Sequence, residues 1–193
     1  MKKIALAVLL ASAFTASQAA VITFDDLSGG ESPIANGYAG LNWNNFWSLD
    51  GVHYGSSGYQ NGVVSANRVA FNAYGDPASL SGNGFSLYSG EFTAAWNDGL
   101  QIRADAVFEG GATSSVTFTA NTSGPINEVF GWNNLSSVTF TSFGGTAGPW
   151  GFNGEHFALD NLSTAAAVPE SSNLALMVAG LGLVGVAARR RKV

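Results

Sequence analysis

Residues 20–165 alternate apolar and polar side chains and show almost none of the 3.6-residue periodicity that helices require. Val, Thr and Phe are common in the alternating runs, and clusters of Gly, Ser, Asn and Asp separate the runs. Several short strands divided by such turns predict an all-β domain, a β-sandwich or jelly roll. The expected strands are 21–24, 40–48, 63–72, 84–95, 99–108, 115–121, 127–132, 136–142 and 155–163.

One five-residue string occurs twice, as Ser115–Thr119 and again as Ser137–Thr141. In both copies Val and Phe occupy alternate positions, so they point to one face of a strand while Ser and Thr point to the other. We expect two antiparallel core strands joined through 120–136.

The first residues have the pattern of an export signal. Lys2 and Lys3 precede an apolar run over 4–14, and Ser17-Gln18-Ala19 places small residues where signal peptidase cleaves. We therefore expect 1–19 to be a signal peptide removed by signal peptidase, and 20–165 to be the exported ectodomain.

The last segment, 166–193, has a different composition. Fifteen uncharged residues, 174–188, reach about 22 Å as a helix, which is short of the roughly 30 Å hydrocarbon core of a bilayer. A helix over 172–188 spans it marginally if the flanking cations extend to the interface. The basic tail at 189–192 would then hold the C-terminus in the cytoplasm; it consists of Arg189, Arg190, Arg191 and Lys192.

This C-terminal pattern resembles the PEP-CTERM sorting signal of exported proteins in Gram-negative bacteria that make exopolysaccharide. The matching residues are Val168, Pro169 and Glu170, followed by the apolar run and the basic tail, and Ser171 replaces the usual second proline of the motif at 168–171. The resemblance implies transient anchoring in the inner membrane, removal of the tail by an exosortase, and a final location at the cell surface or in the extracellular matrix.

The charge of the ectodomain excludes one class of partner. Between residues 20 and 168 the cations are Arg68 and Arg103, against twelve carboxylates, which gives a net charge of −10. Such a surface repels phosphate backbones, so nucleic-acid binding is not expected. The chain has no cysteine, which excludes disulfides and thiolate chemistry.

The opening Ile22–Leu27 and the closing Asp160-Asn161-Leu162 are similar to jelly-roll carbohydrate-binding modules. That resemblance implies that the first and last strands lie side by side, with a structural calcium nearby. Asp25, Asp26 and Asp160 would then supply oxygen ligands for Ca²⁺. The alternative is that these carboxylates end a strand and cap a turn.

Aromatic residues crowd the stretch 37–59 and alternate with Asn side chains. Flat rings beside amides suit sugar binding, so we expect Trp47, Tyr54 and Tyr59 to be exposed and to contact carbohydrate. We expect Trp43 and Phe46 to be core residues, because aromatic rings are usually buried. The remaining tryptophans are expected to be structural; they are Trp96, Trp132 and Trp150.

Catalytic motifs are missing from the sequence: it has neither a His-Glu-x-x-His frame nor a Gly-x-Ser-x-Gly elbow. We therefore expect a non-catalytic protein that associates with exopolysaccharide or the cell envelope. Two alternatives stay open: a self-associating structural or adhesive matrix protein, and a hydrolase of matrix glycans that uses two carboxylates.

Overall fold

The computed structural model describes residues 19–165, so the predicted signal peptide and sorting signal lie outside the described residues. The described part is all-β, with one short helix and two 3₁₀ turns, as the alternation predicts. The strands are β1 (Ala20–Ile22), β2 (Ser32–Pro33), β3 (Asn42–Asn44), β4 (Phe46–Asp50), β5 (Arg68–Asn72), β6 (Ala78–Ala94), β7 (Asn97–Asp98), β8 (Leu100–Phe108), β9 (Thr113–Ala120), β10 (Ile126–Phe143), β11 (Thr146–Ala147) and β12 (Phe157–Ala165). The helical segments are η1 (Tyr38–Gly40), α1 (Gly58–Asn61) and η2 (Ala73–Gly75).

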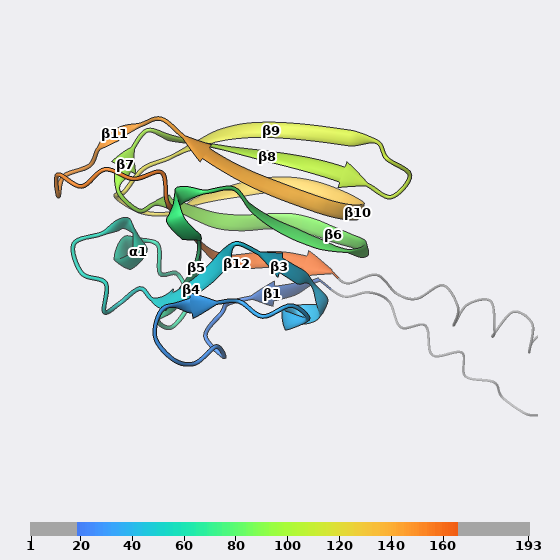
Figure 1. The fold of residues 1–193 in the computed structure, drawn as a ribbon, viewed down its shortest axis with the longest axis horizontal. Coiled ribbons are helices and arrows are strands. Elements are labelled where there is room, and N and C mark those ends of the chain that lie inside the picture. The colour runs from blue at the N-terminus through green and yellow to red at the C-terminus, as the bar shows by residue number, and fades with distance from the viewer. Residues whose placement is uncertain (1–18, 166–193) are drawn as a thin grey trace, which may run out of the picture. The chain divides into compact units, whose positions relative to one another are not determined.

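A long antiparallel ribbon of β6 and β10 organises the fold. The two strands pair from Ile126 opposite Phe92 to Phe140 opposite Ala78, with three register shifts in the middle of the ribbon. Gly84 and Gly131 have φ values of 61° and 62° near these shifts. The left-handed conformation suits glycine, and β-bulges bend strands, so the ribbon turns here. Both strands therefore contribute to two layers (Figure 1).

The first layer contains β3, the first half of β6, the second half of β10, β8 and β9. The second layer contains the other halves of β6 and β10, followed by β12, β5, β4 and β2. Hydrogen bonds join these strands and β1 into one ten-stranded antiparallel sheet, and the bend in the ribbon folds this sheet into two layers that face each other as a sandwich. A separate pair, β7 with β11, lies beside them.

Phenylalanine rings fill the space between the layers. Phe92 lies 4.9 Å from Phe118 and 5.5 Å from Phe140, measured between ring centroids, and Phe46 lies 6.1 Å from Phe157. These rings are buried and meet mostly edge to face or tilted, as quadrupolar rings prefer. The prediction that Trp43 and Phe46 belong to the core is confirmed, since Trp43 is 5% exposed and Phe46 is buried as well.

The first and last strands lie side by side, as the sequence resemblance implies. β1 pairs antiparallel with β12 from Ala20 opposite Thr164 to Ile22 opposite Leu162. This pairing places the two ends of the described segment next to each other on the second layer.

The repeated string does not form an antiparallel pair, so that prediction was wrong. β9 and β10 both pair antiparallel with β8, which therefore lies between them, and the two copies run parallel to each other. Most of the predicted connector is strand, because β10 begins at Ile126. The predicted faces are confirmed: Phe118, Val138 and Phe140 are buried in the core.

The outer face of the second layer carries a separate apolar cluster of its own, formed around Leu49, Val69, Phe71 and Ala158. Residues 51–67, which include α1, cover part of this face. Within the described range, no helix has the length and apolar character needed to cross a membrane.

Candidate functional site

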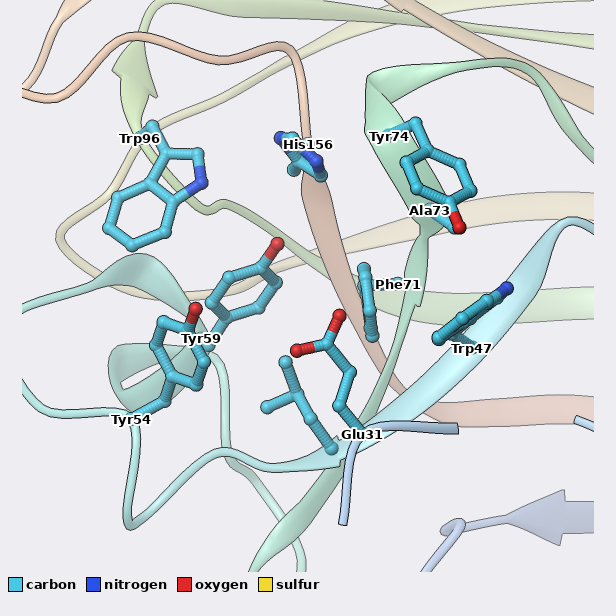
Figure 2. Close-up of a pocket in the computed structure, with 10 residues that line it drawn as sticks. Glu31, Trp47, Tyr54, Tyr59, Phe71, Ala73, Tyr74, Trp96 and His156 are labelled. Carbon is cyan, nitrogen blue, oxygen red and sulfur yellow. The ribbon is translucent and has the colours of Figure 1, made fainter. Parts of the chain in front are cut away.

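A cavity of about 230 Å³ opens on the outer face of the second layer, beside the segment that contains α1. Six aromatic rings line it, together with Leu49, Ala73 and two polar side chains, Glu31 and His156 (Figure 2). The rings are those of Trp47, Tyr54, Tyr59, Phe71, Tyr74 and Trp96. Its size is below the usual range for sites that bind drug-sized ligands, so it suits one small ring or a chain end.

The floor of the cavity follows from strand alternation in β4 and β5. Phe46 and Ser48 of β4 point into the sandwich, so Trp47 and Leu49 point outward. Phe71 of β5 is paired with Trp47 and also faces outward. The same pleat that fills the core with one set of residues therefore places a second apolar surface under the cavity.

One wall, called here the α1 wall, consists of Tyr54, Tyr59 and Trp96. The centroids of Tyr54 and Tyr59 are 5.1 Å apart, and Tyr59 meets Trp96 edge-on at 5.5 Å. Ser57 caps α1 by accepting a hydrogen bond from the backbone N–H of Gln60.

Close backbone packing holds this wall in place. The Gly58 N–H donates to the Ala95 carbonyl at 2.9 Å. A Cβ on Gly58 would lie 1.7 Å from the Ala94 carbonyl oxygen, a distance that no side chain tolerates. Only glycine lets α1 approach β6 this closely, and the approach brings Tyr59 against the sheet.

The opposite wall, called the turn wall, consists of Trp47 and Tyr74, whose rings meet edge-on at 5.9 Å. Tyr74 is 73% exposed, and its backbone has φ 61°, the left-handed region that bulky residues avoid. This conformation costs of the order of 1–3 kcal/mol, and such residues persist only where the surroundings hold them.

Two asparagine side chains provide that support for the turn. The Asn45 amide donates to the carbonyls of Ala73, Asp76 and Pro77, and the buried Asn72 amide donates to the Asp76 carbonyl as well. Asn72 also accepts the N–H of Phe157 at 2.7 Å, which links the turn to β12. Tyr74 is thus held rigidly at the rim although its ring has little packing of its own.

Glu31 is the carboxylate of the cavity, and the loop before β2 positions it. Arg68, a buried residue of β5, donates from its guanidinium to the carbonyls of Gly29 and Gly30 and to Ser48 Oγ. These bonds fix the backbone immediately before Glu31. Figure 2 shows the Glu31 carboxylate directed into the space between the α1 wall and the turn wall.

His156 lies at the other side of the cavity, ahead of β12. Burial lowers the pKa of its imidazole, and the charges of Glu31 and Asp76 oppose this shift. Its Nδ1 atom is buried and has no hydrogen-bond partner among residues 19–165. Burial therefore favours the neutral imidazole of His156, whose other nitrogen can donate or accept one hydrogen bond.

The structure brings together the three residues predicted to contact sugar, since Trp47, Tyr54 and Tyr59 line one cavity. Tyr54 is 40% exposed as predicted, whereas Trp47 is half-buried. The prediction that Tyr59 is exposed was wrong: it is 3% exposed, because Gly58 brings it under Trp96 and onto Phe71.

Sequence reasoning missed seven of the ten lining residues, and four of these seven matter most for binding: Glu31, Tyr74, Trp96 and His156. Trp96 had been expected to be only structural, and it packs on Tyr59 while also facing the cavity. Tyr74 offered one usable indication, because a tyrosine within the turn sequence Ala-Tyr-Gly-Asp-Pro has no strand to pack on. Glu31 and His156 carry no local pattern that marks them.

Asp160, one of the predicted calcium ligands, is fully buried in β12. Its carboxylate accepts hydrogen bonds from the backbone N–H groups of Val64, Ser65 and Asn161 at 2.7–2.8 Å, and from Ser65 Oγ at 2.9 Å. Burial raises the pKa of the Asp160 carboxyl, and these donors oppose the shift. The Asp160 carboxylate therefore holds Val64 and Ser65, which precede β5, against β12.

Asp25 and Asp26, the other two predicted ligands, also have protein partners. Asp25 accepts the N–H groups of Asn67 and Arg68 at 3.1 and 3.0 Å, and Asp26 accepts the Tyr38 hydroxyl at 2.6 Å. Among the residues that the structure describes, no three His, Cys, Asp or Glu side chains form a group that could hold a metal ion. Each of the three carboxylates accepts hydrogen bonds from protein groups, and Asp160 lies within β12 rather than at a turn as the alternative expected. The calcium site stays a prediction.

No protein-family model matches the chain, and no curated protein matches it. Among solved structures, TmCBM61 in complex with beta-1,4-galactotriose is similar with a TM-score of 0.36 at 10% identity, over 66% of this chain and 88% of that one. A variant of CBM29-2, a family 29 carbohydrate-binding module, has a TM-score of 0.37 at 13% identity, over 79% and 93%. The agarase AgWH50C has 0.34 at 8%, over 66% of this chain and 24% of that one. TM-scores this low carry no argument about ligand or activity.

Proposed function

We propose that this chain is a non-catalytic glycan-binding protein and that the cavity between the α1 wall and the turn wall is its binding site. The observation that carries the proposal is Tyr74, an exposed ring held in a strained backbone conformation beside Trp47. Backbone strain of this kind is common at ligand-binding sites, and here it presents a ring with little packing of its own to the cavity.

The chemistry of the lining suits a sugar. The CH faces of a sugar ring pack on aromatic side chains, and its hydroxyls need hydrogen-bond partners, which Glu31 and His156 can supply. Glu31 is the single carboxylate among the lining residues, whereas glycoside hydrolysis uses a pair. Binding therefore fits the cavity better than hydrolysis does.

The proposal includes the two targeting signals predicted from the sequence, an export signal and a C-terminal sorting signal. Residues 1–19 direct export from a Gram-negative bacterium, and 166–193 anchor the chain in the inner membrane until an exosortase removes the tail. The protein would then associate with exopolysaccharide at the cell surface or in the extracellular matrix.

Affinity electrophoresis tests the binding function. The full chain is run through gels containing the exopolysaccharide of the producing bacterium, with calcium and with a chelator. We expect retardation, its loss in Tyr74→Ala, and its retention in Phe143→Ala, a control ring that is 42% exposed and does not line the cavity. Equal mobility of all three proteins with and without glycan would refute the proposal. Loss of retardation in chelator alone would support the calcium prediction.

Self-association is a second candidate, favoured by one edge of the sandwich. Residues 126–132 of β10 pair with β6 on one side, and no described strand pairs with their other side. Val129 on this segment is 70% exposed. Open edges recruit further strands, so a second copy could add here. Sedimentation of the chain and of Val129→Lys across concentration tests this: a strict monomer in both removes the candidate.

A further inference from the structure

Glu31 is a free negative charge inside an aromatic cavity. Its side chain makes no hydrogen bond or ion pair with any residue of 19–165, and it is exposed toward the opening. The two cations of this range are engaged elsewhere: Arg68 with loop carbonyls and Ser48, and Arg103 with Asp105 at 2.8 Å. No arginine of residues 19–165 is therefore available to neutralise Glu31, and burial favours the neutral form of His156, the histidine of the same cavity.

The aromatic rings around Glu31 also favour a positively charged ligand. Aromatic faces attract cations, most strongly tryptophan, and Trp47 and Trp96 stand on opposite walls of the cavity. The surrounding domain has a net charge of −10, and its negative potential also attracts cations. A glycan bearing carboxylates or sulfates would meet repulsion from all three sources.

Resting on the glycan-binding function proposed above, we infer that the cavity selects glycans that carry protonated amino groups, such as a deacetylated amino sugar. The ring of the sugar packs between the α1 wall and the turn wall, and its ammonium group pairs with the Glu31 carboxylate. Arg68 acts as a positioning residue, because its guanidinium holds the backbone of Gly29 and Gly30 before Glu31.

A matched pair of ligands tests the inference by calorimetry on the full chain. The β-1,4-linked glucosamine trimer carries ammonium groups, and the N-acetylglucosamine trimer has the same backbone without charge. Below the pKa of the amine we expect the glucosamine trimer to bind about tenfold more tightly, with a preference that shrinks as ionic strength rises.

The variants separate the local charge from the overall field. Glu31→Gln should remove the preference for the charged trimer, because the Gln side chain carries no charge but keeps an oxygen that can accept from a sugar hydroxyl. Glu109→Gln removes the same charge from the exposed β8–β9 turn and keeps an acceptor for the Gly84 N–H, so the preference should remain. Tyr74→Ala should weaken both trimers.

The possible outcomes distinguish failure of the amine selectivity from failure of the proposed glycan-binding function. Equal binding of both trimers, lost in Tyr74→Ala and unchanged in Glu31→Gln, would overturn the amine selectivity and leave glycan binding in place. A preference lost equally in Glu109→Gln would also overturn it, because the field of the whole domain would then be the cause. Failure of both trimers and of the exopolysaccharide to bind would overturn the proposed function itself.

Discussion

Replacing Asp160 by Asn tests whether this carboxylate serves the fold through protein hydrogen bonds. One oxygen accepts the N–H groups of Val64 and Ser65, and the other accepts Ser65 Oγ and the N–H of Asn161. An asparagine offers one carbonyl oxygen and one NH₂ group. In either orientation the NH₂ group therefore faces donors that have lost their acceptor.

The size of the effect follows from burial. Asp160 is 0% exposed, so water cannot replace the lost acceptor. Each buried donor left without a partner destabilises by roughly 1–3 kcal/mol, and one or two donors are affected, so we expect Asp160→Asn to lower the free energy of unfolding by about 2–4 kcal/mol. For a domain of this size the midpoint of thermal unfolding should fall by roughly 5–15 °C.

Urea unfolding followed by tryptophan fluorescence measures the change, and Asp26→Asn is the control. Asp26 belongs to the same predicted calcium set, but it is exposed and accepts a single hydrogen bond from Tyr38. We expect its substitution to change the unfolding free energy by less than about 1 kcal/mol. The reasoning fails if Asp160→Asn unfolds like the wild type, or if its effect appears with calcium and disappears in chelator.

Three further predictions concern packing, pH and strain. Gly58→Ala should destabilise by about 2–3 kcal/mol in urea, because its Cβ would collide with the Ala94 carbonyl, whereas Gly55→Ala, with open space around it, should not. Burial alone would raise the pKa of Asp25, but two backbone N–H donors lower it. Its contribution to stability is thus present above pH of about 4 and is lost as pH falls below that; in Asp25→Asn this part of the pH dependence should disappear. Tyr74→Asn should keep or slightly raise the melting temperature, since Asn tolerates positive φ, while glycan retardation is lost; a fall of several degrees would argue that Tyr74 serves the fold.

Strand alternation predicts much of the fold because it reports burial directly. The β-class, the burial of Trp43 and Phe46 and the inward faces of the repeated string all follow from which side of a strand is apolar. Strand order does not follow from it. The two copies of the repeat have the same pattern whether they pair with each other or flank β8, so alternation could not choose between these arrangements.

The cavity was only partly predictable for a related reason. Trp47, Tyr54 and Tyr59 are close in sequence, so one dense stretch pointed to them. Glu31 and His156 come from loops far apart in the chain, and the sheet order that joins them is not visible in local patterns. The burial of Tyr59 depends on contact between Gly58 and β6, which only the folded structure supplies.

The ribbon of β6 and β10 has a consequence for how this domain unfolds. Because the same two strands run through both layers, neither layer can come apart while the other stays whole. In a chain without cysteine, this shared ribbon provides the connection between the two layers that a disulfide could otherwise provide.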